Sequence, residues 1–399
     1  MLILKQIIKK FINKIIFLFF PLIKVKSNYN YKILGDTNDH YFVGYYDKDP
    51  VSSSRQYIIC HKVESKYSNL VEPPNAKIGL LDIETNKFND LVSTNAMNWQ
   101  LGSRAQWLDE DTIIYNDIEE DTQCSIKFDV INKVKLIKYK RPFWDISPNK
   151  KFGASLNFSR IKNFRPGYGY IGKNIDNFEE ILTVFSLEND NLIYSITLKE
   201  ILNAVNYAGV VNNDIYLNHI VWSPCNKKLI TIFHSQNKIK NTRLVYPVLI
   251  NLDTKRINFL HKNGYFSHHT FVNKDKILAF LKINDSYRFG IWTVETGWKE
   301  IKNSMPEVDG HPTYIESINK VIVDSYQNKF GIMHLYLGSL DQNNQLKKIA
   351  SIVNHPDYKG PKRCDLHPRV SKKHNFIVCD LPHKNGRKIL LLKEKTNKS

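Results

Sequence analysis

The stretch His219-Ile-Val-Trp222-Ser-Pro-Cys-Asn-Lys-Lys-Leu-Ile230 reads as a short strand, a tight turn and the start of a second strand. The same pattern recurs along the chain, and turn residues such as Asp49-Pro50 and Ser147-Pro148-Asn149 follow the strand. Aligned on the position of Trp222, the seven copies have Lys48, Trp107, Ile146, Trp222, Phe271, Tyr314 and Val370. A repeat of this kind indicates an array of similar structural units.

Each copy continues with a hairpin, in which β-branched and aromatic residues flank a turn of Asp, Asn, Thr or Gly. The hairpins are expected at residues 77–87, 126–133, 184–190, 248–255, 290–297, 335–342 and 388–395. Four strands and roughly 40 to 60 residues per copy are typical of a propeller blade. The sequence therefore predicts an all-β, seven-bladed β-propeller over residues 27–399. The strand Tyr29–Leu34 is expected to complete the last blade and close the ring.

The N-terminal segment, residues 1–26, has the pattern of an amphipathic helix. Ile3, Ile7 and Phe11 fall on one side of this helix, and the opposite side is rich in lysine. The apolar run Ile15–Ile23 is shorter than the roughly 20 residues that span a bilayer. We predict a segment that lies on the inner face of the membrane. A secretory signal or uncleaved anchor, and a helix docked on the propeller, are the alternatives.

The chain is basic, with 57 Lys and Arg against 39 Asp and Glu and a formal net charge of +18. This excess favours anionic partners, here an anionic carbohydrate, a sugar phosphate or the membrane surface, although codon bias toward lysine would give the same composition. Nucleic acid is not expected, because no known binding module is present. Five widely spaced cysteines without a Cys-x-x-Cys pair favour reduced thiols and a cytoplasmic protein; an exported or N-terminally anchored protein is the alternative.

Four consecutive copies of the repeat have histidine at one position, three residues before the Trp222 position. These residues are His219, His268, His311 and His367. Equivalent positions on the inner strands of a propeller converge near its axis, so several imidazoles are expected to meet there. Such a group is typical of a divalent metal site, of the manganese or zinc type. His269 is an alternative to its neighbour His268, because a shift of one residue reverses the face of a strand. Alternatively, these histidines only end inner strands.

Charged residues accompany the histidines. Asp309 and Asp365 each lie two residues before a histidine and are predicted to accept its second ring N–H, or else to cap turns. Arg104 and Arg369 are predicted to bind a carboxylate or phosphate, or else to form structural ion pairs.

Two regions are predicted to contact the substrate. The third blade has an insertion in which arginine and tyrosine alternate, and long loops in compact domains are usually functional, although packing is the alternative. The first inner strand adds polar aromatic surface. The predicted substrate-binding residues are Tyr45, Tyr46, Asp47, Arg160, Arg165, Tyr168 and Tyr170.

The Trp-Ser-Pro turn and the strands Gly310-His311-Pro312 and Asp365-Leu-His367-Pro-Arg369 resemble those of seven-bladed propellers of the TolB-like and oligogalacturonate lyase type. The likeness covers about residues 30–397. The lyase family binds a divalent metal through histidines and a glutamine, and it eliminates across a uronic acid. The resemblance implies metal ligands among the repeat-position histidines, His268, His311 and His367 above all, with Gln106 as the nearest glutamine.

These features predict a metal-assisted, lyase-like enzyme that acts on an anionic glycan or activated sugar in cell-surface polysaccharide metabolism. Arg104 or Arg369 would neutralise a uronate carboxylate, and His219 would remove the adjacent proton. A glycosyl or sugar-phosphate transferase of polysaccharide biosynthesis would use the same basic surface. A non-catalytic propeller that binds a glycan or protein partner is the alternative from another class.

Overall fold

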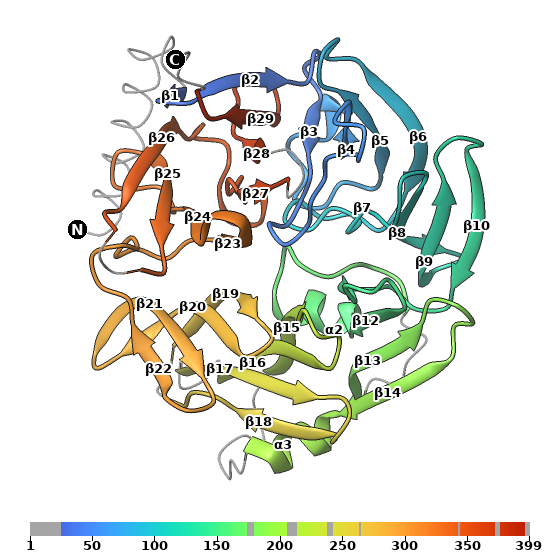
Figure 1. Ribbon diagram of the computed structural model, residues 1–399. Helices are drawn as coiled ribbons and strands as arrows, with labels where there is room; N and C mark the ends of the chain where they lie inside the picture. Colours follow the sequence, from blue (N-terminus) through green and yellow to red (C-terminus); the bar gives the residue numbers. More distant parts are fainter. Residues whose placement is uncertain are drawn as a thin grey trace. The chain divides into compact units, whose positions relative to one another are not determined.

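The computed structural model describes residues 25–173, 179–205, 214–237, 242–262, 265–341, 344–371 and 376–395. These residues form seven antiparallel sheets, and the fold is a mainly-β, seven-bladed propeller (Figure 1). The amphipathic helix predicted within residues 1–26 lies almost wholly outside the described residues. Within the described ranges, no helix combines the length and the hydropathy needed to cross a membrane.

The chain divides into two compact units, of which the first comprises residues 1–93, 99–102 and 301–399. Its three sheets contain β3 (His40–Phe42), β4 (Tyr57–Val63), β5 (Ala76–Asp82) and β6 (Phe88–Thr94); β23 (Pro312–Ile315), β24 (Lys320–Asp324), β25 (Ile332–Ser339), β26 (Lys347–Val353) and β1 (Val25–Ser27); and β27 (Arg369–Val370), β28 (Phe376–Leu381), β29 (Lys388–Lys393) and β2 (Asn30–Leu34). Strand β2 pairs with β29, which is the pairing that the sequence predicts for Tyr29–Leu34 (Figure 1). Strand β1 adds a fifth strand beside β26, which the repeat does not predict.

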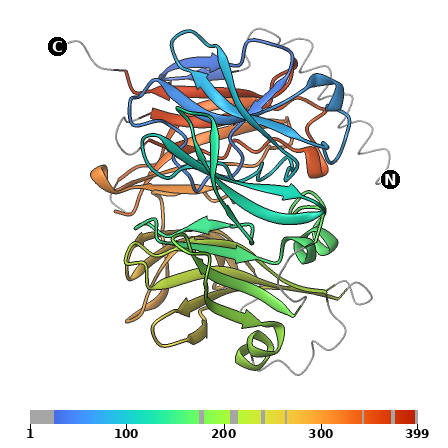
Figure 2. The same cartoon turned by 90° about the vertical axis from the view of Figure 1, so that its right-hand side faces the viewer.

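The second unit comprises residues 94–98 and 103–300. Its four sheets contain β7 (Gln106–Trp107), β8 (Thr112–Glu119), β9 (Thr122–Asp129) and β10 (Val134–Tyr139); β11 (Asp145–Ile146), β12 (Phe152–Leu156), β13 (Glu180–Ser186) and β14 (Leu192–Thr197); β15 (Asp214–Trp222), β16 (Lys228–Asn237), β17 (Thr242–Asn251) and β18 (Arg256–Phe259); and β19 (Phe266–Asn273), β20 (Lys276–Ile283), β21 (Ser286–Thr293) and β22 (Gly297–Glu300). Two helices, α2 (Phe158–Phe164) and α3 (Leu198–Val205), accompany them. The colours of Figure 2 run from teal to orange along these sheets.

The outer hairpins of the first six blades form where the sequence predicts them, whereas in the last blade β29 pairs with β28 and β2 and the described part of 388–395 forms no hairpin. A residue with a left-handed backbone lies in the hairpin turns at Asn86, Lys133, Asp190, Lys255 and Gly297, with φ between 55° and 62°. Asn, Asp and Gly adopt this conformation at low steric cost, which accounts for three of these turns, whereas the two lysines adopt it at the higher cost of an ordinary side chain.

The alignment of the first blade on Lys48 is wrong. The inner strand β3 ends at Phe42, and the chain then turns between Gly44 and Asp49. The bridge Val51–Ile58 is the counterpart of the Trp222–Leu229 pair in the fourth blade. The chain leaves the strand direction at Gly44, whose φ of +112° is open mainly to glycine. A Cβ atom at this position would lie 2.5 Å from the carbonyl oxygen of Leu101.

Candidate metal-binding site

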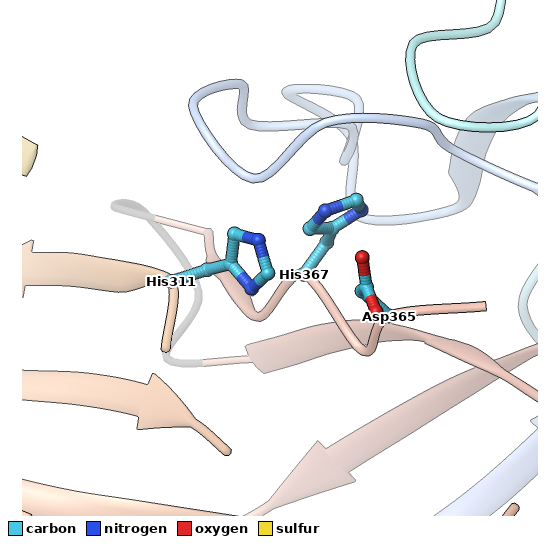
Figure 3. Close-up of side chains that lie close together, drawn as sticks. All are labelled: His311, Asp365 and His367. Carbon is cyan, nitrogen blue, oxygen red and sulfur yellow. The ribbon is translucent and has the colours of Figure 1, made fainter. Parts of the chain in front are cut away.

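Two of the four repeat-position histidines come together in the first unit. His311 lies just before β23 and His367 just before β27, and their ring centroids are 4.3 Å apart. Asp365 comes from the same loop as His367, and the ligating atoms of the three side chains lie within 4.8 Å of one another (Figure 3). All three residues are buried. In the part of the chain that the structure describes, this is the group of His, Cys, Asp and Glu side chains that can hold a metal ion.

Hydrogen bonds at Nδ1 orient the rings of both histidines. Nδ1 of His367 lies 2.7 Å from the carbonyl oxygen of Gly44, which can only accept, so Nδ1 must donate. Nδ1 of His311 lies 2.9 and 3.0 Å from the two carboxylate oxygens of Asp324. A neutral imidazole that donates from Nδ1 has its lone pair on Nε2, as in metal sites where a carboxylate or carbonyl orients the ligand.

Asp324, the last residue of β24, organises this site. Its carboxylate also accepts the backbone N–H of His311 at 2.7 Å and that of His367 at 3.1 Å. Asp324 therefore accepts the second ring N–H of His311, which the sequence predicts of Asp309. The sequence predicts the same contact between Asp365 and His367. Asp365 lies among the candidate ligands instead and pairs with Arg363 at 2.7 Å, while Asp309 is half-buried.

A second repeat position could have indicated Asp324 from the sequence. An aspartate occurs near the end of the second strand in three blades: Asp117 in β8, Asp324 in β24 and Asp380 in β28. Each accepts backbone N–H groups from a segment of another strand or loop: Asn95 for Asp117, His367 for Asp324 and Val43 for Asp380. The sequence alone does not single out this position, because aspartate is also frequent in turns.

The environment of His311 attracts positive charge. Burial lowers the pKa of His311, but the charge and hydrogen bond of Asp324, with the charges of Asp365 and Asp309, leave this pKa raised above its usual value. The close approach to β24 requires the glycine that precedes His311. A Cβ atom on Gly310 would lie 1.8 Å from the carbonyl oxygen of Asp324. This negative, preformed cluster fits a divalent cation with mixed nitrogen and oxygen ligands.

Arg369, predicted to grip an anionic ligand, is fully buried and bound by the protein itself. Its guanidinium pairs with Asp380 at 3.2 Å, and it donates to the carbonyl oxygen of Tyr45 at 2.9 Å and to that of Gly44. Asp380 in turn accepts the backbone N–H of Val43 at 2.8 Å. Arg369 thus contacts the same Gly44 carbonyl oxygen that accepts the hydrogen bond of His367.

Two of the predicted substrate-binding residues flank the histidines. The ring of Tyr45 lies 5.0 Å from that of His367, and the ring of Tyr46 lies 5.2 Å from that of His311, centroid to centroid. Both tyrosines are buried. Asp47 is only half-buried, and its carboxylate lies 4.0 Å from the ammonium group of Lys48.

The other two repeat-position histidines lie in the second unit and also meet each other. The ring centroids of His219 and His268 are 6.0 Å apart, and Trp144 lies 5.5 Å from His219. His269, the alternative to His268, packs against Phe266 at 5.4 Å. Burial and the charge of Arg165 hold the pKa of His219 well below its usual value, so the neutral form of its ring is favoured.

The backbone is left-handed at three residues that the alignment makes equivalent: Arg104 has φ of 60°, His219 of 59° and His367 of 46°. Non-glycine residues in this region each cost about 1–3 kcal/mol and concentrate at functional sites. The Nε–H of Arg104 donates to the carbonyl oxygen of Trp144 at 2.8 Å. Gln106 begins β7 in the same unit and is buried.

The insertion of the third blade forms α2 and contributes to packing. Nε of Arg160 donates to the carbonyl oxygen of Ile215 at 2.5 Å, and Tyr170 stacks on Phe158 at 4.7 Å. Arg165 lies 4.1 Å above the ring of Tyr168, whose centroid is 6.1 Å from that of His219. Of the four predicted residues in this insertion, Tyr168 is thus beside a candidate catalytic histidine.

Comparison with known proteins identifies the fold. An oligogalacturonate lyase in complex with manganese superposes with a TM-score of 0.65 at 12% identity, over 93% of this chain and 94% of that one. An oligogalacturonate lyase from Vibrio parahaemolyticus gives 0.61 at 11% identity, over 92% and 97%. The propeller domain of the Trilobed protease from Pyrococcus furiosus gives 0.51 at 12% identity, over 90% and 94%. No protein-family model and no curated protein sequence matches the chain. At these identities the likeness shows the fold, and the chain is a seven-bladed propeller similar in structure to oligogalacturonate lyases.

Proposed function

We propose that this protein is a metal-assisted, lyase-like enzyme that acts on an anionic glycan in cell-surface polysaccharide metabolism. The observation that supports the proposal is the buried cluster of His311, Asp365 and His367, whose ligating atoms lie within 4.8 Å of one another and whose two imidazoles are oriented by hydrogen bonds at Nδ1. An oligogalacturonate lyase of similar fold binds manganese. Two histidines and a carboxylate are ligands that manganese, iron and zinc accept.

A bound divalent ion would neutralise the carboxylate of a uronic acid and so acidify the proton on the adjacent carbon. The protein's own residues would hold that ion through His311, Asp365 and His367, and Asp324 would orient His311. The rings of Tyr45 and Tyr46 would exclude water beside the two histidines. Burial of these groups in a medium of low dielectric strengthens every electrostatic interaction at the site.

His219 is the proposed general base, because it occupies the repeat position that His311 and His367 share and equivalent positions of a propeller are expected to converge. It would take the proton from the carbon next to the carboxylate while the C4–O bond breaks, the electron pair leaves with the glycosidic oxygen, and a C4–C5 double bond forms. Burial disfavours the imidazolium form of His219. An anionic substrate would offset this effect, because a nearby negative charge raises the pKa of a histidine.

Manganese-supplemented protein is expected to generate ultraviolet absorbance from the new double bond when it is given oligogalacturonate. The variant His219→Asn should lower kcat by about 10²–10⁴-fold, which is the usual contribution of a general base. His261→Asn, at a half-buried histidine of the same unit, is the matched control and should retain full activity. The lyase proposal fails if metal-loaded protein is inert on galacturonate, glucuronate and mannuronate polymers alike.

We also propose that residues 1–26 attach the enzyme to the inner face of the membrane, because their lysines would meet anionic headgroups. Full-length protein should sediment with vesicles that contain phosphatidylglycerol, and protein lacking residues 1–26 should stay in the supernatant. Equal sedimentation of both proteins would place the membrane affinity elsewhere.

A further inference from the structure

A second candidate site lies in the first unit, in a pocket of about 80 Å³. Its walls come from the β28–β29 turn, the loop between β26 and β27, the β4–β5 connection, the β6–β7 connection and the start of β3. The aromatic and basic residues that line it are His40, Trp99, Tyr358, Lys362, Lys384 and Arg387. A space of this size holds a single small group rather than a whole ligand.

Arg387 is the central feature of the pocket. Its side chain is 2% exposed and is surrounded by aromatic rings, with the guanidinium carbon 4.6 Å from the ring centroid of Trp99 and 5.8 Å from that of Tyr358. Its Nη atoms donate only to backbone carbonyls, at 2.7 Å to Trp99 and at 3.0 Å to Lys362. Among the described residues, Nε of Arg387 has no hydrogen-bond partner.

A carboxylate that would neutralise Arg387 is missing from the described residues around it. The single acidic residue at the pocket is Asp357, whose carboxylate is 84% exposed and lies 3.5 Å from His355. A buried charge without a counter-ion is costly, and the carbonyl oxygens and aromatic faces around Arg387 offset only part of the lost hydration. The guanidinium of Arg387 therefore gives the pocket a fixed positive charge.

The neighbouring groups add to this positive potential. Lys384 lies exposed on the β28–β29 turn at the rim, and Nζ of Lys362 donates to the carbonyl oxygen of Ser68 at 3.1 Å. Nδ1 of His40 accepts the backbone N–H of Arg387 at 3.1 Å, so its Nε2 carries the proton toward Ser68. Burial and the charges of Arg387 and Lys388 lower the pKa of His40 to about 3. The imidazole is therefore neutral at pH 7 and adds no charge to that of the neighbouring cations.

We propose that this pocket is an oxyanion site that binds a carboxylate or phosphate group of a ligand between Arg387 and Lys384. The planar guanidinium supplies directed N–H donors, and the rings of Trp99 and Tyr358 suit the apolar face of an attached sugar. The same short segment reaches the candidate metal site: the carbonyl of Arg363 accepts from Arg387 at 3.0 Å, and the side chain of Arg363 pairs with Asp365. The site does not depend on a metal.

Calorimetric titration of the full chain, stripped of metal with EDTA and then dialysed into EDTA-free buffer of low ionic strength, tests this proposal, with sodium galacturonate, inorganic phosphate and neutral galactose as probes. Galacturonate or phosphate should bind and galactose should not. Tighter binding of galacturonate identifies a sugar carboxylate as the ligand group, and tighter binding of phosphate identifies a phosphate. Absence of binding by both anions would overturn the proposal.

Two variants locate the binding. Lys384→Glu, at an exposed position, should weaken anion binding by about tenfold, since it reverses a charge at the rim. Lys347→Glu, on β26 and away from the pocket, makes the same change in net charge and should weaken binding less than about twofold. Arg387→Met, which removes the buried guanidinium, should abolish anion binding. Equal weakening by the two lysine variants would show diffuse attraction to a basic surface and would overturn the site. Because the metal has been removed before the titration, the anion affinities measured in this way are independent of the metal site and of lyase activity.

Discussion

The protein purified from a metal-containing medium should carry about one divalent ion per chain, and the variant His311→Ala/His367→Ala should carry almost none. The double substitution removes two of the three candidate ligands and leaves Asp365 alone, and a single buried carboxylate does not retain a divalent ion against water. We expect the loss of at least about three orders of magnitude in metal affinity, since second-shell changes alone cost about 10–100-fold. Metal content by mass spectrometry of the dialysed protein is the measurement.

The matched control is His334→Ala, which removes a histidine of the same unit that is hydrogen-bonded to Ser351 and takes no part in the cluster. It should keep the full metal content. The variant Asp324→Asn gives a graded test, because it preserves the shape of the side chain but removes the charge that orients His311. Its metal affinity should fall by about 10–100-fold. Negligible metal in the wild-type protein after reconstitution with manganese and zinc would refute the site and favour a non-catalytic propeller or a metal-free transferase.

Most of the fold was predictable from the sequence repeat. Hairpin turns were predictable because Asn, Asp and Gly adopt left-handed backbone conformations, and blade strands were predictable from their apolar pattern. The partner of β1 was not predictable, since Val25 pairs with Ile352, more than 300 residues away. The break at Gly44 was also missed, because it depends on the close approach of Leu101 from another part of the chain.

The site was only partly predictable. Histidine at one repeat position indicated a shared location for His311 and His367, which the structure places in contact. The sequence pattern could not distinguish an arginine that binds a ligand from one that forms a buried ion pair, as Arg369 does with Asp380. Both kinds occur at the ends of strands. Nor could it show that Arg387 lacks a counter-ion, because that property depends on every segment packed around the side chain.

Arg369→Met is expected to destabilise the protein by about 3–5 kcal/mol, because it leaves Asp380 buried without its charge partner. Both side chains are at most 2% exposed, so water cannot replace the lost ion pair. Urea denaturation followed by circular dichroism measures the change. Arg288→Met is the matched control: it breaks a 2.7 Å pair with Glu300 whose partners are 33% and 20% exposed, and it should cost less than about 1 kcal/mol.

The double variant Arg369→Met/Asp380→Asn separates the charge from the geometry. It should recover part of the lost stability, since the uncompensated carboxylate is gone. Its metal affinity should nevertheless stay below that of the wild-type protein, because Gly44 would lose the donor that fixes the carbonyl bound to His367. A different pattern, in which Arg369→Met keeps wild-type stability and metal content but fails to turn over substrate, would mean that the guanidinium leaves Asp380 to bind the ligand. Arg369 would then be a catalytic residue, as its position in the repeat predicts.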